Sequence, residues 1–382
     1  MSSIKHKIKL AGYKCILSSN KVWLCPVKKK KMLCRSLLRL SYSDNPRAIS
    51  EKMHEIDPEW EIVWAFKEPE KKKSVVPEYV KCIRNNSLAF IYHQATAGFW
   101  IENYCIPPES IKRSGQTYIQ TWHGDRTIKK FLYDMYDDEK ALNLYESSNC
   151  DLALAASTFG EKIYHSSFHY FGQLLTMGSP RNDVLVNGDD DAVQDFRREY
   201  NIPESVNLLL YAPTFRDSNK SNDQKVEQLN LGEVLRHLET KSGKEWRLLS
   251  RGHTGRHLLF EGVDLQQVID ASDYEDSRYV LLAADAIISD YSSMATDFVL
   301  TGRPTFFYIN DLDAYTGNDR ALWFDLKSTP FWCAKNQSEL LTLIDNYTEE
   351  TARDNCRAIL EFYGSNETGN AAEAVCKYMI DR

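Results

Sequence analysis

The sequence predicts an α/β fold built on parallel strands. Short apolar runs of strand type recur along the chain, each bounded by polar residues or glycine, and segments of helical or polar character separate them. Continuous apolar runs are typical of parallel strands buried on both faces, and their alternation with helices indicates α/β architecture. With 382 residues the chain is too long for one ordinary domain, which favours two.

Eight apolar runs carry the strand prediction. In chain order they are Glu61–Ala65, Leu88–His93, Tyr118–Thr121, Leu152–Ala156, Leu208–Tyr211, Trp246–Ser250, Ala286–Ser289 and Thr305–Ile309. The stretch Val186–Ile202 interrupts this order with Asn187-Gly188, which is a turn signal, and with three successive aspartates. It predicts a boundary between a first domain, residues 1–186, and a second, residues 187–382, although the aspartates also suit a helix N-cap inside one domain.

The segment 28–40 combines dense positive charge with a leucine stripe. Four lysines at positions 28–31 precede Leu33, Leu37 and Leu40, which stand at helical spacing. A basic amphipathic helix of this kind suits a surface of anionic lipid, which would make the protein a peripheral membrane protein. The same pattern suits a helix that packs its leucines on the core and leaves its lysines in water. Both interpretations stay open.

The composition excludes several classes of protein. Forty-seven basic and 54 acidic residues give a net charge of −7, which argues against a nucleic-acid binder of the usual basic kind. The nine cysteines include no CxxC pair, so reduced cytosolic thiols are the simplest interpretation. No signal peptide and no apolar run of about 18 residues is visible, so we expect a cytoplasmic protein, either soluble or attached to the inner face of the membrane. The signatures of common NTPases, dehydrogenases, zincins and GxSxG hydrolases are absent.

A histidine stands at the end of one predicted strand. Trp122, His123 and Gly124 follow the run Tyr118–Thr121, and Arg126 comes two residues later. Ligands of open α/β sheets bind at the carboxyl ends of strands. A histidine there can exchange a proton near neutral pH, and glycine lets a backbone approach closely. Because a single histidine is more often structural, this position alone leaves both roles open.

Two later strand ends carry cationic side chains. Arg216 suits a bidentate contact with phosphate, but it equally suits a surface pair with Asp217. Arg251 and His253 flank a glycine, an arrangement that suits a diphosphate.

A third strand end, after Ala286–Ser289, enters an expected helix that carries Asp297. Ser292 and Ser293 stand where this helix begins, and hydroxyls with backbone N–H groups at a helix N-terminus form an anion site. A serine that only caps the helix needs no ligand, so that alternative remains.

Six short blocks carry a resemblance to a known family. They are Ser43–Ile49, Gln120–Gly124, Gly178–Asp183, Tyr211–Asp217, Ser289–Ser293 and Phe307–Leu312. In this order they resemble the CDP-glycerol glycerophosphotransferase family, the enzymes of teichoic-acid and related capsule polymer synthesis. The match extends over most of the chain.

The resemblance implies a GT-B fold, in which two Rossmann-like domains face each other across a cleft. The first domain would receive the acceptor and the second would hold the nucleotide donor, and the last helix can pack back on the first domain. The implied reaction transfers a polyol phosphate, glycerol phosphate above all, from CDP-glycerol or CDP-ribitol to a hydroxyl of a lipid-linked or polyol-phosphate acceptor, with release of CMP. No nucleic acid takes part.

The resemblance also implies residue roles. His123 matches the family's base. The expected residues of the donor site are Arg216, Arg251, His253, Ser292, Ser293 and Asp297, and those of the acceptor side are Trp122, Gly124 and Arg126. Because positioning and fixed cations dominate phosphoryl transfer, we expect no cofactor and no obligatory metal.

The sequence departs from the family pattern in two places. Asp125-Arg126 stands where Thr-Pro is commoner, and Gly252-His253-Thr254 stands where His-Pro is commoner. The chain resembles the shorter primase-like or capsule members, without the long N-terminal extension of the large polymerases. Two rival functions remain: a nucleotide-sugar glycosyltransferase of the same fold, and a non-catalytic module that binds anionic polymer or lipid.

Overall fold

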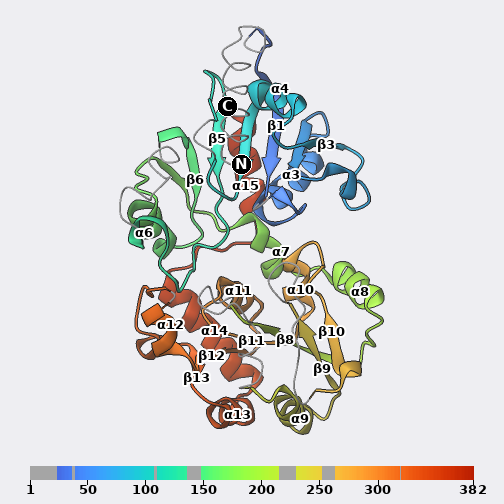
Figure 1. The fold of residues 1–382 in the computed structure, drawn as a ribbon, viewed down its shortest axis with the longest axis vertical. Helices are drawn as coiled ribbons and strands as arrows, with labels where there is room; N and C mark the ends of the chain where they lie inside the picture. The colour runs from blue at the N-terminus through green and yellow to red at the C-terminus, as the bar shows by residue number, and fades with distance from the viewer. Residues whose placement is uncertain are drawn as a thin grey trace, which may run out of the picture.

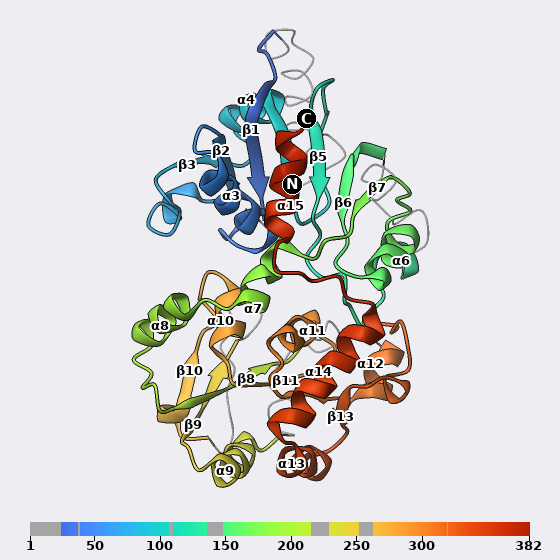
Figure 2. The same cartoon turned by 180° about the vertical axis from the view of Figure 1, so that it is seen from behind.

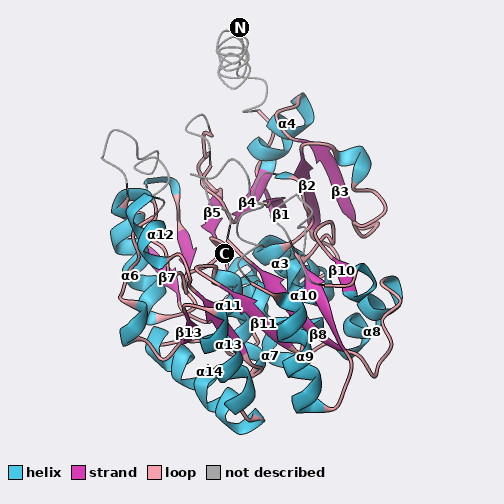
Figure 3. Cartoon of the chain, turned by 60° about the horizontal axis from the view of Figure 1, so that its bottom comes forward, coloured by secondary structure: helices cyan, strands magenta, loops and turns pink. Residues whose placement is uncertain are grey.

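Two parallel sheets organise the chain. The structure is a computed structural model that describes residues 24–36, 39–106, 110–135, 148–214, 229–251, 263–318 and 320–382. It shows two lobes, each with one sheet and helices against it (Figures 1 and 3). The first sheet has seven strands in the order β3-β2-β1-β4-β5-β6-β7, and the second has six in the order β10-β9-β8-β11-β12-β13. All pairings between these strands are parallel, which confirms the α/β prediction.

The strands are short and mostly buried. Those of the first sheet are β1 (Lys28–Arg35), β2 (Glu61–Phe66), β3 (Val80–Arg84), β4 (Ala97–Glu102), β5 (Thr117–Gln120), β6 (Leu152–Leu154) and β7 (Gln173–Leu175). Those of the second are β8 (Asn207–Ala212), β9 (Trp246–Ser250), β10 (Val268–Asp270), β11 (Ala286–Ser289), β12 (Thr305–Tyr308) and β13 (Trp332–Ala334). Seven of the eight predicted runs are strands.

Helices connect the strands. The α-helices are α3 (Asp44–Ile56), α4 (Leu88–Thr96), α6 (Thr158–Ser167), α7 (Asp183–Asn187), α8 (Asp190–Glu199), α9 (Leu231–Ser242), α10 (Ser277–Ala283), α11 (Ser293–Phe298), α12 (Leu312–Asn318), α13 (Gln337–Asn346), α14 (Glu349–Tyr363) and α15 (Ala371–Ile380). Single 3-10 turns are η2 (Pro69–Lys71), η3 (Leu132–Asp134), η5 (Pro180–Asn182), η7 (Leu265–Gln267), η8 (Val299–Thr301) and η9 (Leu326–Ser328).

The strand order reverses once in each sheet. In the first sheet it reverses between β1 and β4, and in the second between β8 and β11. In open α/β sheets such reversals mark the edge at which ligands bind, beyond the carboxyl ends of the strands. The fold therefore offers two candidate binding edges, one in each lobe.

The last helix returns to the first lobe. After α14 the chain crosses from the second lobe to the first, where α15 lies beside α3 (Figure 2). Val375, Cys376 and Met379 of α15 belong to the core of the first sheet. This crossing segment ties the two lobes together a second time, which matters for the site because it carries Glu367.

The helix predicted for the basic segment 28–40 is wrong, since Lys28–Arg35 forms the central strand β1. The apolar residues after the lysines lie inside the sheet, and that burial overrides the helical spacing of the leucines. Leu37 lies outside the described residues. Lys28 and Lys30 are exposed at the start of the strand and pair with Glu61 and Glu59. In the part of the chain that the structure describes, no helix is both long and apolar enough to cross a membrane.

The run Leu88–His93 is helix α4 instead of a strand. The Ser87 hydroxyl caps it by accepting a hydrogen bond from the Phe90 N–H at 3.1 Å. A short apolar run does not distinguish a buried helix from a buried strand. The strand of this unit is β4, which begins directly after the helix at Ala97.

The stretch Val186–Ile202 is mostly helical. It contains the end of α7, Gly188 with a φ of 77°, and α8. The side chain of Asp189 caps α8 by accepting a hydrogen bond from the Ala192 N–H at 3.0 Å. This agrees with the alternative in which the aspartates form a helix N-cap. Leu185 and Phe196 pack into the core of the second sheet. The boundary at residue 186 itself stays a prediction.

Candidate functional site

His123 stands on a strained turn after β5. The preceding residue, Trp122, has a φ of 50°, which residues other than glycine rarely adopt. Two side chains hold this turn: the Gln120 side-chain oxygen accepts from the Trp122 N–H at 2.8 Å, and the Asn45 amide donates to the Trp122 carbonyl at 3.0 Å. Backbone strain that neighbouring groups enforce is concentrated at functional sites.

The ring of His123 has a defined tautomer. Its Nδ1 lies 2.7 Å from the carbonyl oxygen of Asn103. Because a carbonyl can only accept, Nδ1 carries the proton and Nε2 keeps its lone pair when the ring is neutral. Burial lowers the pKa of His123, although the Asn103 carbonyl and Asp44 act to raise it; Arg181 and Lys129 lower it further. The ring is therefore neutral near pH 7 and can accept a proton at Nε2.

Aromatic rings surround the histidine on one side. Trp122 is buried, with its ring centroid 4.1 Å from that of His123, and it also packs on Phe131 and Phe168. Tyr104 is 43% exposed and its ring lies 6.2 Å from that of His123. Trp122, predicted on the acceptor side, thus packs against the ring of His123 from the buried side. Tyr104 lies next to the same ring and is exposed to solvent.

Gly124 brings the two lobes into contact next to His123. Its φ is 151°, and a Cβ at this position would lie 3.0 Å from the Oγ of Ser293 and 3.2 Å from its Cβ. Ser293 begins α11 in the second lobe, and Ser292 caps that helix by accepting from the Met294 N–H at 3.2 Å. The structure therefore places His123 and the predicted donor serines side by side.

A buried ion network lies behind this contact. We define it by Asp44, Arg126, Arg181, Asp297 and Glu367. Arg126 donates to Asp297 at 2.8 Å, to Glu367 at 2.7 Å and to the Thr296 carbonyl at 3.2 Å. Burial alone would lower the pKa of Arg126, but Glu367 and Asp297 raise it above its ordinary value, so the side chain stays charged.

Arg181 connects the ion network to the candidate base. Its guanidinium donates to Asp297 at 2.5 Å, to Asp44 at 3.1 Å and to the carbonyl of His123 at 2.6 Å. Since Asp297 is on α11 of the second lobe, the backbone of the base is tied to that lobe through a single side chain. Asn182 adds hydrogen bonds to Asp297 and Glu367, at 3.1 and 2.8 Å.

Two of the residues predicted to contact substrate take part in the ion network. Arg126, predicted on the acceptor side, is 1% exposed and all its nitrogens are engaged. Asp297, predicted at the donor, has both carboxylate oxygens occupied by Arg126, Arg181 and Asn182. Both residues link the two lobes through these contacts, and their predicted contacts with a substrate stay predictions.

The other predicted donor residues lie further along the edge or outside the described residues. Arg251 follows β9, and its Nη1 donates to the carbonyls of Ala271 and Tyr274 at 2.8 and 3.0 Å. Burial lowers its pKa. Arg216 and His253 lie outside the residues that the structure describes. Their roles, like that of Arg251, stay predictions.

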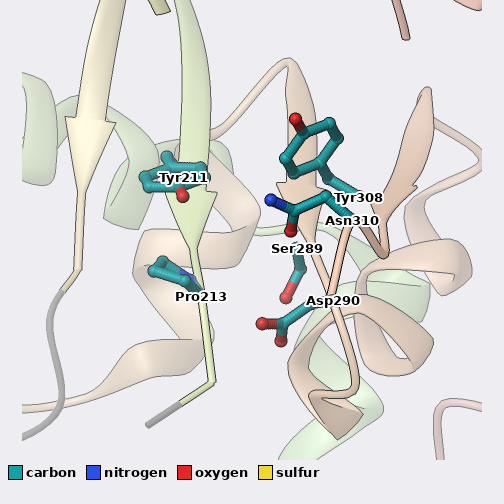
Figure 4. Close-up of a pocket in the computed structure, with 6 residues that line it drawn as sticks. All are labelled: Tyr211, Pro213, Ser289, Asp290, Tyr308 and Asn310. Atoms are coloured by element: carbon teal, nitrogen blue, oxygen red, sulfur yellow. The ribbon is translucent and has the colours of Figure 1, made fainter. Parts of the chain in front are cut away.

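A small pocket lies at the reversal point of the second sheet. Its lining comes from the ends of β8, β11 and β12 (Figure 4); the residues are Tyr211, Pro213, Ser289, Asp290, Tyr308 and Asn310. Asp290 accepts from the backbone N–H groups of Thr214 and Tyr291 at 2.8 and 2.7 Å, which fixes the strand ends. Within the described ranges, no group of three or more His, Cys, Asp or Glu residues is arranged to hold a metal ion.

The sequence did not assign roles to several residues of this site. Asp44 and Asn45 come from one of the blocks that carry the family resemblance, and Arg181 and Asn182 come from another. The blocks were the available signal, but neither block follows a strand that the sequence predicted. Glu367 is in neither block, and only the return of the chain to the first lobe brings it there.

Comparison with known proteins decides the family. Residues 17–381 match the family described as CDP-Glycerol:Poly(glycerophosphate) glycerophosphotransferase. The chain belongs to this family. It is 30% identical over 353 residues to the teichoic acid poly(glycerol phosphate) polymerase of Staphylococcus epidermidis, covering 85% of this chain and 47% of that protein. It is 27% identical over 376 residues to the polymerase of the same name from Bacillus spizizenii, covering 94% of each.

Solved structures of this glycerophosphotransferase family give the fold. A variant of the wall teichoic acid polymerase TagF, soaked with CDPG, matches with a TM-score of 0.82 at 26% identity over 100% of this chain and 95% of that chain. The family resemblance and the GT-B fold are thus confirmed. The chain spans about half the length of the S. epidermidis polymerase and of its Bacillus subtilis counterpart, 47% and 44%.

Proposed function

We propose that this glycerophosphotransferase-family chain transfers a polyol phosphate, glycerol phosphate above all, from a CDP-activated donor to a hydroxyl acceptor and releases CMP. The product would extend a teichoic-acid-like or capsular cell-surface polymer. The names of the relatives support this: three of them are poly(glycerol phosphate) polymerases, and TagF crystals were soaked with CDPG.

The observation that carries the proposal is that the turn with His123 meets the start of α11, where Gly124 lies against Ser293. The neutral imidazole presents a free Nε2 because Nδ1 is committed to the Asn103 carbonyl, and Gly124 brings it next to the start of α11. In the proposed reaction Nε2 removes the proton of the acceptor hydroxyl as the oxygen attacks the phosphorus that bears the polyol. The bond from that phosphorus to the bridging oxygen breaks, and CMP leaves with the electron pair.

The leaving CMP needs positive charge or hydrogen-bond donors around the bridging oxygen. We propose that Ser292, Ser293, Arg251, Arg216 and His253 supply them, without a cofactor and without an obligatory metal. The arginines of the ion network do not contribute, because their charge is already neutralised by carboxylates. Turnover in the presence of EDTA tests the metal expectation.

The decisive assay measures CMP release and product mass with purified protein, CDP-glycerol or CDP-ribitol, and a hydroxyl-bearing polyol-phosphate acceptor. General-base catalysis contributes about 100- to 10,000-fold, so His123→Ala should lose turnover to that extent while it keeps its fold and its donor affinity. His237→Ala, at a partly exposed histidine paired with Asp345, is the matched control and should retain wild-type turnover. Normal turnover of His123→Ala would refute the base assignment, and preference for UDP-sugars would refute the donor class.

We further propose that the protein works at the cytoplasmic face of the membrane, with a lipid-linked acceptor. The support is the exposed Lys28 and Lys30 with Leu24, which is 79% exposed, at the start of β1. Cosedimentation with vesicles that contain or lack anionic lipid tests this location. Equal recovery in both supernatants would reject it.

A further inference from the structure

Two arginines lie at the binding edge of the first sheet, close to His123. Arg35 ends β1, and the strand register pairs it with Glu102 at the end of β4, which in turn pairs with Gln120 at the end of β5. His123 follows Gln120 by three residues. Strands β1, β4 and β5 are neighbours (Figure 3), and the strand order reverses between the first two. A ligand at this edge would therefore reach the candidate base.

The guanidinium of Arg35 is buried, and part of it is unpaired. Its Nε donates to Glu102, its Nη1 lies 3.5 Å from the side-chain oxygen of Asn85, and its carbon lies 5.0 Å from the centre of the Phe90 ring. Its Nη2 is buried and has no hydrogen-bond partner among the described residues. A buried donor without an acceptor is unfavourable unless a ligand supplies one.

Arg39 carries two unfavourable features at once. Its φ is 60°, in the left-handed region that a side chain of this size rarely adopts. Its side chain is partly buried, its Nε is unpartnered, and no ion pair to it occurs within the described ranges. Burial and the neighbouring Arg35 lower its pKa, although Glu102 opposes this. Strain and an unpaired charge at one residue point to a functional role.

Residues 102–104 join these arginines to the candidate base. Glu102 binds Arg35, and the next residue, Asn103, accepts from His123 Nδ1 through its carbonyl. Tyr104 follows and lies with its exposed ring beside His123. Two guanidinium groups face a single carboxylate here, so this edge carries one net positive charge. The charge and the free donors suit an anion with several acceptor oxygens.

We propose that Arg35 and Arg39 form an anion subsite, which binds a phosphate group of the acceptor and thereby places the acceptor hydroxyl beside His123. The inference rests on the proposed function, because it assumes a polyol-phosphate acceptor. Such an acceptor carries a phosphodiester next to its terminal hydroxyl. The phosphate oxygens accept from the unpaired nitrogens, so binding offsets the free-energy cost that the empty subsite carries.

The test compares two acceptors that differ only in phosphate: a short glycerol-phosphate oligomer and a phosphate-free polyol. Arg39→Gln should raise the KM of the phosphate-bearing acceptor at least 10-fold, leave the KM of the CDP donor within 2-fold, and leave the phosphate-free acceptor unaffected. Arg39→Lys keeps the charge but loses the planar guanidinium with its several donors. Its acceptor KM should therefore lie between those of wild type and Arg39→Gln. An equal effect on both acceptors, a rise in donor KM, or no change would each overturn the subsite.

A second variant separates binding from folding. Glycine tolerates a φ of 60°, so Arg39→Gly should unfold at the same or a higher denaturant concentration than wild type, yet lose the phosphate-dependent part of acceptor affinity. Arg84→Gln, which removes an exposed arginine of the same lobe that pairs with Glu70, is the matched control and should keep the wild-type KM. Wild-type acceptor affinity in Arg39→Gly would overturn the proposal.

Binding measured without donor keeps the two proposals distinguishable. If wild type releases no CMP, the proposed function fails, but calorimetric titration of the oligomer into wild type and Arg39→Gln still reports on the subsite. If wild type turns over and the oligomer binds both proteins equally, the subsite alone fails. At low salt the wild-type affinity should exceed that of the variant at least 10-fold.

Discussion

Replacing Arg126 with methionine tests whether the ion network holds the two lobes together. Methionine keeps much of the apolar stem and removes the guanidinium. The substitution deletes the ion pairs to Asp297 and Glu367 and the hydrogen bond to the Thr296 carbonyl. All these groups remain buried, so the two carboxylates lose a cation without gaining access to water.

The expected loss is about 3 to 5 kcal/mol in the free energy of unfolding, because removal of one partner leaves buried charge uncompensated. Arg126 serves two carboxylates, but the loss should not double. Asp297 keeps the guanidinium of Arg181, and Glu367 keeps hydrogen bonds from the Ser179 N–H and the Asn182 amide. The remaining donors limit the cost to the range for one broken pair.

The loss should also depend on pH in a defined direction. Burial raises the pKa of Glu367, and Arg126 opposes that rise. Without Arg126 the carboxyl binds a proton more readily in the folded protein than in the unfolded chain. A group whose folded pKa lies above its unfolded value favours the folded state as pH falls. The difference between wild type and Arg126→Met should therefore shrink between about pH 8 and pH 5.5.

The assay is denaturant unfolding followed by tryptophan fluorescence, at both ends of this pH range. The double variant Arg126→Met/Glu367→Gln removes the uncompensated charge and should recover about 1 kcal/mol or more relative to the sum of the single variants. The reasoning would be refuted if Arg126→Met unfolded at the wild-type denaturant concentration. The reasoning would also be refuted if the difference in unfolding free energy between wild type and Arg126→Met grew toward low pH.

Four further predictions follow, three on the base and its surroundings and one on a second buried histidine. Arg181→Lys keeps charge but cannot bind the His123 carbonyl and Asp297 together, so kcat should fall by about 100-fold, typical of slight misplacement, with donor KM unchanged in steady-state assays. Because burial lowers the pKa of His123 below 6.5, the acid limb of the kcat/KM profile should lie below pH 6.5, and a limb above that value would contradict the assignment. Gly124→Ala should lower turnover by about 10-fold or more, since its Cβ would meet Ser293, and wild-type rates would show that the contact is loose. His93 is buried and its pKa is lowered to about 4, so unfolding experiments should show a loss of about 2 kcal/mol from pH 7 to pH 5 that His93→Gln lacks.

Local sequence patterns predicted the second lobe better than the first. Runs such as Leu208–Tyr211 and Ala286–Ser289 are mostly apolar and are bounded by polar residues. The sequence pattern expected of a buried strand therefore agrees with the burial of β8 and β11 in the structure. In β1 the burial comes from neighbours distant in sequence, β2 and β4, while the lysines at its start obscure the pattern. Where tertiary contacts decide burial, local spacing is misleading.

The same difference applies to the site. His123, Gly124 and Ser293 follow strands directly, so the rule that ligands bind at strand ends finds them. The partners of Arg126 and Asp297 could not be predicted, because these two residues stand 171 positions apart and meet through lobe packing. Composition predicts that such groups exist, but only the fold shows that they form ion pairs with each other.

The charge balance of the ion network is compatible with the anionic donor that we propose to bind beside it. Three carboxylates face two guanidinium groups, so the network has no positive charge to attract a pyrophosphate. Its carboxylates are all paired with arginines, and Asp297 and Glu367 are buried, which limits the repulsion that the carboxylates exert. In the proposed reaction, Arg251 and groups further along that edge attract the donor, while the unpaired Arg39 in the other lobe attracts the acceptor. Changes in the network should therefore alter stability and kcat, whereas changes at Arg39 should alter acceptor KM, and the two effects can be measured independently in one set of variants.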